Sequence, residues 1–250
     1  NNKLMVFNQA AYDIMVIPSQ VLPFDTSEFC NNLAITRDVF NERMKAAVTY
    51  SRRAPSIFIK QVSAETYARL QEKMFMYPGF YVQSRTLRKY SRPIAAHILG
   101  YVSEADENII RKNPYYKPGD YIGTLGIEES YEKELRGRKG VKIYLVDVYS
   151  RIKGSYESGT MDTAAVQGED IVSTVDMELQ EYAELLMKNK SGSIVAIEPS
   201  SGEILTLVSS PNYDPELLVG RVRSENYSTL QEDTTKPIFN RALMASYPPG

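Results

Sequence analysis

The chain has 250 residues, 43% of them hydrophobic and 24% charged, with a formal net charge of −2 at pH 7. These values are typical of a globular protein of one long or two ordinary domains, and they exclude extensive disorder and a basic surface for nucleic acid. A single cysteine, Cys30, excludes an intramolecular disulfide, and a single histidine, His97, gives poor support to a zinc site or a catalytic triad. We expect Cys30 to be a small buried residue, His97 to be structural, and the chain to hold no cofactor and no metal.

The first third of the chain predicts strands and helices in alternation. Residues 3–7 and 12–17 are short, partly β-branched or aromatic runs, and Pro18 closes the second, so we expect two strands. Two helices follow. Thr26 or Ser27 is placed to cap the first of them and Thr36 the second.

A strand over residues 57–59 comes next, and Ser63 is placed to cap a helix that buries Tyr67, Leu70 and Met74 at helical spacing. Beyond this helix a basic cluster is interleaved with apolar residues; its members are Arg85, Arg88, Lys89 and Arg92. Two interpretations stay open for the cluster. It is a solvated strand face, or Arg85, Arg88 and Arg92 form a surface for a protein partner.

The middle of the chain predicts helices with acidic first turns. Ser103 and the acidic residues after it are typical of a helix start. Residues 123–128 open a second helix that runs to Leu135 and buries Ile127, Tyr131 and Leu135. A phosphate-binding loop at Gly123 and Gly126 is poorly supported, because a third glycine and a preceding strand are missing. Residues 141–145 then predict a strand.

Residues 155–167 are rich in Ser, Thr, Gly and Ala, and they mark a domain boundary. After it we expect a strand over 171–175 and a helix capped by Asp176, with a buried face of Leu179, Tyr182, Ala183 and Leu186. Residues 193–198 and 203–208 predict a β-hairpin whose apolar runs require cover on both faces, at least partly by helices.

The sequence ends in Tyr247-Pro248-Pro249-Gly250, which cannot continue a helix because proline lacks the N–H group. Ser246 has no lysine three residues later, since Pro249 stands there, and Lys236 has no serine three residues earlier. We therefore expect Ser246 to be a surface or packing residue rather than a nucleophile.

Several motifs, in this order along the chain, resemble those of the class B penicillin-binding proteins, and more closely their elongation-type branch. The motifs are His97-Ile98-Leu99-Gly100-Tyr101-Val102, Gly126-Ile127-Glu128, Leu135-Arg136-Gly137 with Gly140, residues 192–199, Ser210-Pro211-Asn212-Tyr213-Asp214-Pro215, Asn240-Arg241-Ala242 and the final Tyr-Pro-Pro-Gly. In that family Ser-x-x-Lys, the acylated serine and its lysine, would follow directly. The resemblance assigns structural roles to Gly126, Glu128, Arg136, Gly140, Asn240, Arg241 and Gly250.

The resemblance implies an α+β fold in two domains. Residues 1–165 correspond to the elongated, non-catalytic pedestal, also called the dimerisation domain. Residues 166–250 correspond to the opening helix and strands of the transpeptidase domain, as a fragment that stops before the nucleophile. A catalytic domain cut short leaves the hairpin partly uncovered, so we expect dimers, disorder near the C-terminus or dependence on the pedestal.

Members of the family cross-link peptidoglycan stem peptides through an acyl-serine intermediate, and β-lactams trap that serine. The resemblance therefore implies a parent at the periplasmic face of the bacterial inner membrane, anchored by a segment outside this sequence, and a soluble fragment without the catalytic serine. Implied partners are stem peptides and β-lactams for the parent, and a glycan polymerase and elongation scaffold proteins. Two alternatives remain: a non-catalytic interaction module for the elongation machinery, or a β-lactam sensor domain.

Overall fold

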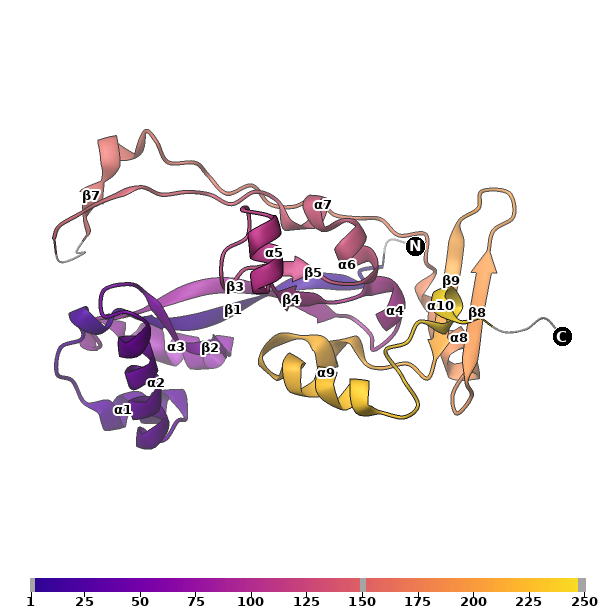
Figure 1. The fold of residues 1–250 in the computed structure, drawn as a ribbon, viewed down its shortest axis with the longest axis horizontal. Coiled ribbons are helices and arrows are strands. Elements are labelled where there is room, and N and C mark those ends of the chain that lie inside the picture. The colour runs from indigo at the N-terminus through magenta and orange to yellow at the C-terminus, as the bar shows by residue number, and fades with distance from the viewer. Residues whose placement is uncertain (1–2, 149–151, 247–250) are drawn as a thin grey trace. The chain divides into compact units, whose positions relative to one another are not determined.

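The structure, a computed structural model, describes residues 3–148 and 152–246 (Figure 1). The chain forms two compact units. Unit 1 comprises Asn1–Phe7, Arg88–Gly140 and Ala164–Gly250, and unit 2 comprises Asn8–Leu87 and Val141–Thr163. Helices and strands occur in both units, which confirms the mixed α+β fold class. The domain boundary after residue 165 stays a prediction, and the compact units group residues 88–140 with 164–250.

Unit 2 contains most of a sheet with the strand order β2-β1-β3, and a two-stranded ribbon, β6-β7. Strand β2 runs antiparallel to β1, with Ile14 opposite Ile59. The elements are β1 (Val6–Val16), α1 (Thr26–Leu33), α2 (Arg37–Tyr50), β2 (Ser56–Val62), α3 (Ala64–Gln71), β3 (Phe80–Tyr90), β6 (Tyr144–Val146) and β7 (Ile152–Ser155). The first residues of β1 and the last of β3 belong to unit 1.

The core of unit 2 is a cluster of aromatic rings. The ring centroid of Phe29 lies 4.7 Å from those of Tyr77 and Phe80, and 5.9 Å from those of Phe40 and Phe58. Two of these pairs meet edge to face and two are tilted, arrangements that the ring quadrupoles favour over direct face-to-face stacking. Phe29 and Phe58 are completely buried. Cys30 is also buried, which confirms its expected role.

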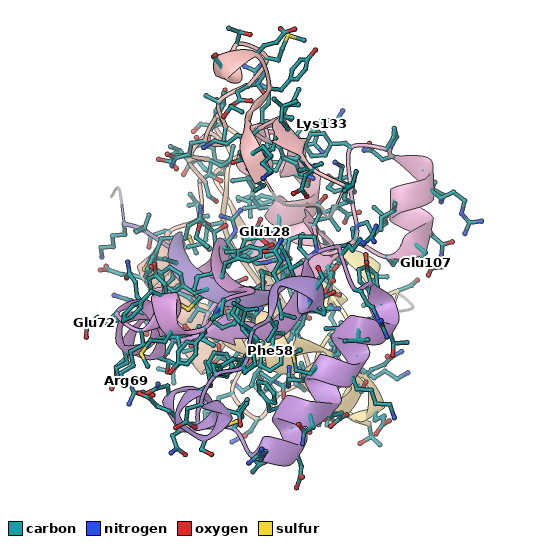
Figure 2. All side chains as sticks on the ribbon, turned by 90° about the vertical axis from the view of Figure 1, so that its left-hand side faces the viewer. Phe58, Arg69, Glu72, Glu107, Glu128 and Lys133 are labelled. Atoms are coloured by element: carbon teal, nitrogen blue, oxygen red, sulfur yellow. The ribbon has the colours of Figure 1, made fainter. Side chains whose placement is uncertain are left out.

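Figure 2 shows how the side chains of unit 2 divide between its interior and its surface. Phe58 lies among closely packed side chains, whereas Arg69 and Glu72, at the end of α3, point away from them. The division follows the sequence pattern of α3, in which Leu70 is completely buried between these two exposed charged residues.

The helix caps of unit 2 test the predicted boundaries. Thr36 caps α2 and Ser63 caps α3, each by accepting a hydrogen bond from a backbone N–H three residues later, so both predictions are confirmed. The prediction for α1 was wrong, because Asp25 is the cap and accepts from the N–H groups of Ser27 and Glu28. A carboxylate is at least as good an acceptor as a hydroxyl at the positive end of a helix.

Unit 1 contains short helices and two antiparallel strand pairs, β4-β5 and β8-β9. Its elements are α4 (Ala96–Leu99), β4 (Val102–Glu104), α5 (Glu107–Lys112), β5 (Tyr121–Gly123), α6 (Gly126–Ser130), α7 (Glu132–Arg136), α8 (Met177–Leu186), β8 (Gly192–Ile197), β9 (Ile204–Ser210), α9 (Arg223–Glu232) and α10 (Arg241–Met244). Helix α8 packs on β9, and α4 packs on α6.

Several predicted boundaries were wrong, and in β1 and β4 the reason is strand pairing that the local sequence pattern did not indicate. Residues 6–7 and 12–16 of the two predicted strands lie in one strand, β1, which continues through the residues between them. Ser103 lies in β4, and Asp106 caps α5 instead. The helix predicted up to Leu135 is interrupted at Tyr131, and residues 171–175 lie outside the strands.

Two predicted buried faces also differ from the structure. In α8 the buried residues are Met177, Gln180 and Ala183, whereas Tyr182 is 58% exposed and Leu186 46% exposed. In α6 and α7, Glu128 is buried and Tyr131 is 47% exposed. In both places a polar side chain occupies the buried position, because it binds a specific partner there.

The hairpin β8-β9 is confirmed, with Ile194 opposite Val208. Val195 and Ile197 on β8 are 44% and 54% exposed, so one face of the hairpin is only partly covered. Helices α8 and α10 pack on the hairpin, in line with the expected helical cover, and the expectation of a partly uncovered hairpin is confirmed.

Among the described residues, the structure has no helix that combines the length and the apolar character needed to cross a membrane. The same part of the chain contains no group of three or more His, Cys, Asp or Glu residues arranged to hold a metal ion.

Candidate functional site

The basic cluster at the end of β3 is neutralised by carboxylates from the same unit in each case. Its ion pairs are Arg85 with Asp13 in unit 2, and Arg88 with Glu128, Lys89 with Glu216 and Arg92 with Glu181 in unit 1. The side chains of Arg85 and Arg88 are only 18% and 16% exposed. A solvated strand face is therefore the wrong description of these two residues. The partner-surface role of Arg85, Arg88 and Arg92 stays a prediction.

Arg88 and Glu128 form a buried, two-pronged ion pair within unit 1. The Nε atom of Arg88 lies 2.7 Å from Oε1 of Glu128, and Nη2 lies 2.9 Å from Oε2. The planar guanidinium matches a carboxylate in this parallel arrangement, so the pair fixes direction as well as distance. Figure 2 shows Glu128 among packed side chains, while Glu107 in the same unit points outward. The pair connects the end of β3 to α6.

Gly126 occupies a position where a side chain cannot fit. Its φ is +61°, and a Cβ atom there would lie 2.2 Å from the carbonyl oxygen of Ile98. Gly100 faces it with φ of +74°, and a Cβ on Gly100 would lie 1.7 Å from the carbonyl oxygen of Leu125. Both the left-handed backbone and the close approach require glycine. The turn after α4 and the start of α6 are thus in direct backbone contact.

Arg136 is held by two tyrosines and a glutamate. Its Nη1 donates to the hydroxyl oxygen of Tyr116 at 2.7 Å and lies 3.4 Å from Oε2 of Glu132, and its guanidinium carbon lies 3.7 Å from the ring centroid of Tyr115. Tyr116 in turn donates to Glu132. Burial, followed by the Glu132 carboxylate, raises the pKa of Tyr116 to about 12. The hydroxyl therefore keeps its proton at neutral pH. Gly140 is exposed and lies further along the same segment.

Asn240 and Arg241 organise the start of α10. The side chain of Asn240 caps the helix by accepting from the N–H groups of Ala242 and Leu243. The guanidinium of Arg241 donates to the carbonyl oxygens of Thr235 and Lys236, at 2.6 and 3.1 Å, so it closes the loop in front of the helix. Gly250, the last residue of the predicted set, lies outside the described residues.

Ser246 is exposed, in agreement with its expected role. The spacing Ser-x-x-Lys does occur at Ser130 and Lys133. However, α6 ends at Ser130 and α7 begins at Glu132, so the two exposed residues lie on different helices. An acylating serine needs its base within hydrogen-bond reach, and this pair carries no such arrangement. Another match, Ser150 with Lys153, begins outside the described residues.

Residues 89–97 carry four polar links to residues 181–237 of the same unit, and we call these links the joint. Two of the links are ion pairs, Lys89–Glu216 at 2.5 Å and Arg92–Glu181. The other two are hydrogen bonds, from the Ala95 N–H to Oε1 of Glu184 at 2.7 Å and from Nε2 of His97 to the carbonyl oxygen of Pro237 at 2.8 Å. The joint connects the part of unit 1 before residue 140 to the part after residue 164.

Two members of the joint have shifted pKa values. Burial raises the pKa of Glu184, although hydrogen bonds from Ala95, Gln180 and Asn212 oppose this shift. Burial lowers the pKa of His97, so its imidazole is neutral at neutral pH. Because a carbonyl oxygen only accepts, the bond to Pro237 requires the proton to lie on Nε2.

The sequence pattern does not reveal the joint. Glu184 has the spacing of a surface residue on α8, and its role depends on Ala95, whose backbone is left-handed at φ of +60°. Only the apolar residues on both sides of His97 indicated that this side chain is enclosed.

Comparisons with known proteins agree with this fold. The family model "Penicillin-binding Protein dimerisation domain" matches residues 1–173. The peptidoglycan D,D-transpeptidase MrdA of Acinetobacter baumannii is 32% identical, covering 84% of this chain and 31% of that protein. MrdA of Escherichia coli K12 is 31% identical, covering 98% of this chain and 40% of that protein. The chain thus spans less than half the length of these relatives.

A solved structure, the complex between penicillin-binding protein PBP2 and MreC from Helicobacter pylori, superposes with a TM-score of 0.73 at 21% identity. The match covers 96% of this chain and 46% of the other. PBP2 from the same organism, in another structure, gives a TM-score of 0.65. These likenesses show a shared fold, and the family match shows membership. The chain therefore belongs to the penicillin-binding protein dimerisation domain family.

Proposed function

We propose that the chain is the pedestal and the opening of the transpeptidase domain of a peptidoglycan D,D-transpeptidase that works in cell-wall elongation. The observation that carries this proposal is the 31% identity to the E. coli transpeptidase MrdA, which extends over 98% of the chain and so includes residues of both predicted domains. The boundary between these domains, after residue 165, is part of the proposal, as is a place in the bacterial cell envelope.

In this proposal the chemistry belongs to a serine beyond residue 250, and the chain supplies the support for it. In the family, the serine attacks the D-Ala-D-Ala donor, releases the last D-alanine and passes the acyl group to an amine of a neighbouring stem peptide. The predicted family-motif residues have structural roles that fit this support. Glu128 fixes β3 to α6, Arg136 fixes α7, and Asn240 and Arg241 fix α10.

Covalent labelling with a fluorescent penicillin tests the proposal. The full-length gene product is expected to form a labelled acyl-enzyme at a single serine, and residues 1–250 alone are expected to remain unlabelled. Peptide mapping of the label locates the serine. An unlabelled full-length protein contradicts the transpeptidase assignment, and a label on any serine of residues 1–250 contradicts the division of roles.

A second function, docking onto an elongation scaffold, is favoured by one observation. The H. pylori PBP2 with the same fold was solved in complex with MreC. We propose that a scaffold protein and a glycan polymerase bind the pedestal of this chain, and that stem peptides, β-lactams and a second copy are further partners of the parent. A β-lactam sensor is the weaker alternative, because sensing gives no reason for a long pedestal.

The basic cluster offers a direct test of docking. Arg92 is the suitable position, because its side chain is 36% exposed and its partner Glu181 is 51% exposed. Arg92→Glu is expected to weaken binding of the pedestal to the scaffold while leaving the thermal midpoint within about 2 °C. Glu225→Arg, an exposed charge reversal at the start of α9, is the matched control. Unchanged scaffold affinity in Arg92→Glu removes this residue from the interface.

A further inference from the structure

The loop of residues 233–240, between α9 and α10, is held by side chains that bind its carbonyl oxygens. Arg241 donates to the carbonyl oxygens of Thr235 and Lys236. Ser209 of β9 donates to the carbonyl oxygen of Phe239 at 3.0 Å and accepts from the Arg241 N–H at 2.9 Å. These contacts come from α10 itself and from the neighbouring strand, so they belong to the same part of unit 1 as the loop.

His97 provides a contact of a different origin. It lies on α4, more than a hundred residues earlier in the chain, and its Nε2 donates to the carbonyl oxygen of Pro237 at 2.8 Å. The imidazole is held edge-on against the ring of Tyr213, with ring centroids 5.4 Å apart and an interplanar angle of 73°. Tyr213 is buried together with Ala96 and Leu218. The donor atom therefore has a fixed position, set by α4 and its packing.

The loop that His97 holds leads directly into α10. Asn240 caps this helix, and Asn240-Arg241-Ala242 is the segment that resembles the approach to the nucleophile in class B penicillin-binding proteins. A shift of the loop at Pro237 moves the start of α10, because only Ile238 and Phe239 separate Pro237 from the helix cap Asn240. Displacements of about 1 Å at a reacting group are enough to lower a rate by orders of magnitude.

We propose that His97 is a positioning residue, through which residues 88–140 set the place of α10 and of the nucleophile segment that follows it. The inference rests on the proposed function. In this arrangement the imidazole contacts neither substrate nor the reacting serine. It acts through the Pro237 carbonyl. The rest of the joint, including the hydrogen bond from the Ala95 N–H to Glu184, keeps α4 in place beside β9.

Two substitutions of His97 test its hydrogen-bond donor and its aromatic ring separately. His97→Phe keeps an aromatic ring against Tyr213 and removes the donor, while His97→Gln places an amide N–H close to the position of Nε2. In the full-length gene product, His97→Phe is expected to lower the acylation rate constant for a fluorescent penicillin about 5- to 10-fold, with the dissociation constant of the initial complex unchanged. His97→Gln is expected to restore the rate to within about twofold of the wild type.

Ser103→Ala is the matched control, because it removes one hydrogen bond, between the hydroxyl groups of Ser103 and Thr124 at 2.8 Å, in the same unit and away from the loop. It is expected to leave the acylation rate constant unchanged. If His97→Phe acylates like the wild type, or if Ser103→Ala slows acylation as much as His97→Phe, His97 has no positioning role.

Hydrogen exchange supplies a readout that is independent of activity. In His97→Phe, the backbone amides of Arg241, Leu243 and Met244 are expected to exchange faster, and in Ser103→Ala they are expected to keep their wild-type protection. Unchanged exchange in His97→Phe overturns the inference. A full-length protein that fails to react with penicillin contradicts the proposed function instead, and the exchange experiment then still decides whether His97 holds the loop.

Discussion

The interior of unit 2 is built from aromatic rings, whereas the joint of unit 1 is built from charged and polar side chains. Phe29 and Phe58 in unit 2 are completely buried and contact several other rings. In unit 1, His97 and Glu184 bind backbone atoms of single residues. Aromatic burial is stabilising and tolerates small displacements, while a hydrogen bond weakens steeply with distance and angle. The ring cluster of unit 2 therefore contributes mainly stability, and the joint fixes the positions of the segments that it links.

The largest effect is expected in the ring cluster. Phe29→Ala removes a completely buried ring and leaves a cavity between Phe58, Tyr77 and Phe80, so it is expected to lower the free energy of unfolding by about 4 kcal/mol. Urea unfolding measures this change. Phe75→Ala is the control, because Phe75 is 83% exposed and its loss is expected to cost less than about 0.5 kcal/mol. Equal losses in the two variants contradict the placement of the core.

A smaller effect is expected at the buried ion pair. Glu128→Gln removes the carboxylate charge that pairs with the mostly buried guanidinium of Arg88 and is expected to cost about 3 kcal/mol, the lower end for buried pairs because Arg88 is 16% exposed. Glu129→Gln, at the exposed neighbour, is expected to be close to neutral. The same unfolding experiment compares them, and a loss below about 1 kcal/mol in Glu128→Gln shows that the pair gives direction without stability.

A still smaller loss of stability is expected at Gln180. Its side chain is completely buried, where Nε2 donates to the Leu207 carbonyl oxygen at 3.0 Å and Oε1 accepts from the Leu207 N–H at 3.0 Å. The amide thus pairs with β9 as a neighbouring strand would. Gln180→Leu leaves both backbone groups without these bonds and is expected to cost about 2 kcal/mol. Faster hydrogen exchange at Leu207 is expected to accompany the loss, and unchanged exchange there argues against the pairing.

The smallest effect is the pH dependence contributed by His97. Its pKa in the folded protein is lowered by burial, so the unfolded chain takes up a proton first as the pH falls below about 6.5. This contribution to stability is complete above that pH and is lost as the pH falls toward the folded pKa, by at most about 1.4 kcal/mol per pH unit. His97→Gln lacks the titration, so the stability of the wild type is expected to fall relative to His97→Gln between pH 7 and 5. Parallel pH profiles contradict the burial of the imidazole.

The sequence predicted elements whose signals are local, and it missed contacts that depend on distant residues. The caps Thr36, Ser63 and Asp176 were correct, because an N-cap acts within three residues of itself. On the predicted buried face of α8, Ala183 was correct, but Leu179 and Tyr182 were wrong, because Gln180 is the residue that finds hydrogen-bond partners on β9. No local rule assigns a buried position to glutamine in place of leucine.

The predicted site residues also fall into two groups, those that the sequence identified and those whose partners it did not reveal. Gly126, Glu128, Arg136, Asn240 and Arg241 were identified by resemblance, and their contacts give each a physical reason for its residue type. The basic residues Arg85 and Arg88 were identified as charged, but their partners Asp13 and Glu128 lie 72 and 40 residues away in sequence. Charge patterning along the chain does not reveal such pairs.

Gly100 and Gly126 have a consequence for the order in which the chain folds. A Cβ on Gly100 would collide with the carbonyl oxygen of Leu125, and a Cβ on Gly126 with that of Ile98, so each turn fills space beside the other's backbone. This close approach exists only when both turns are in place. The two turns, 26 residues apart in the chain, are therefore expected to become ordered together in a single cooperative step, which closes the loop between them.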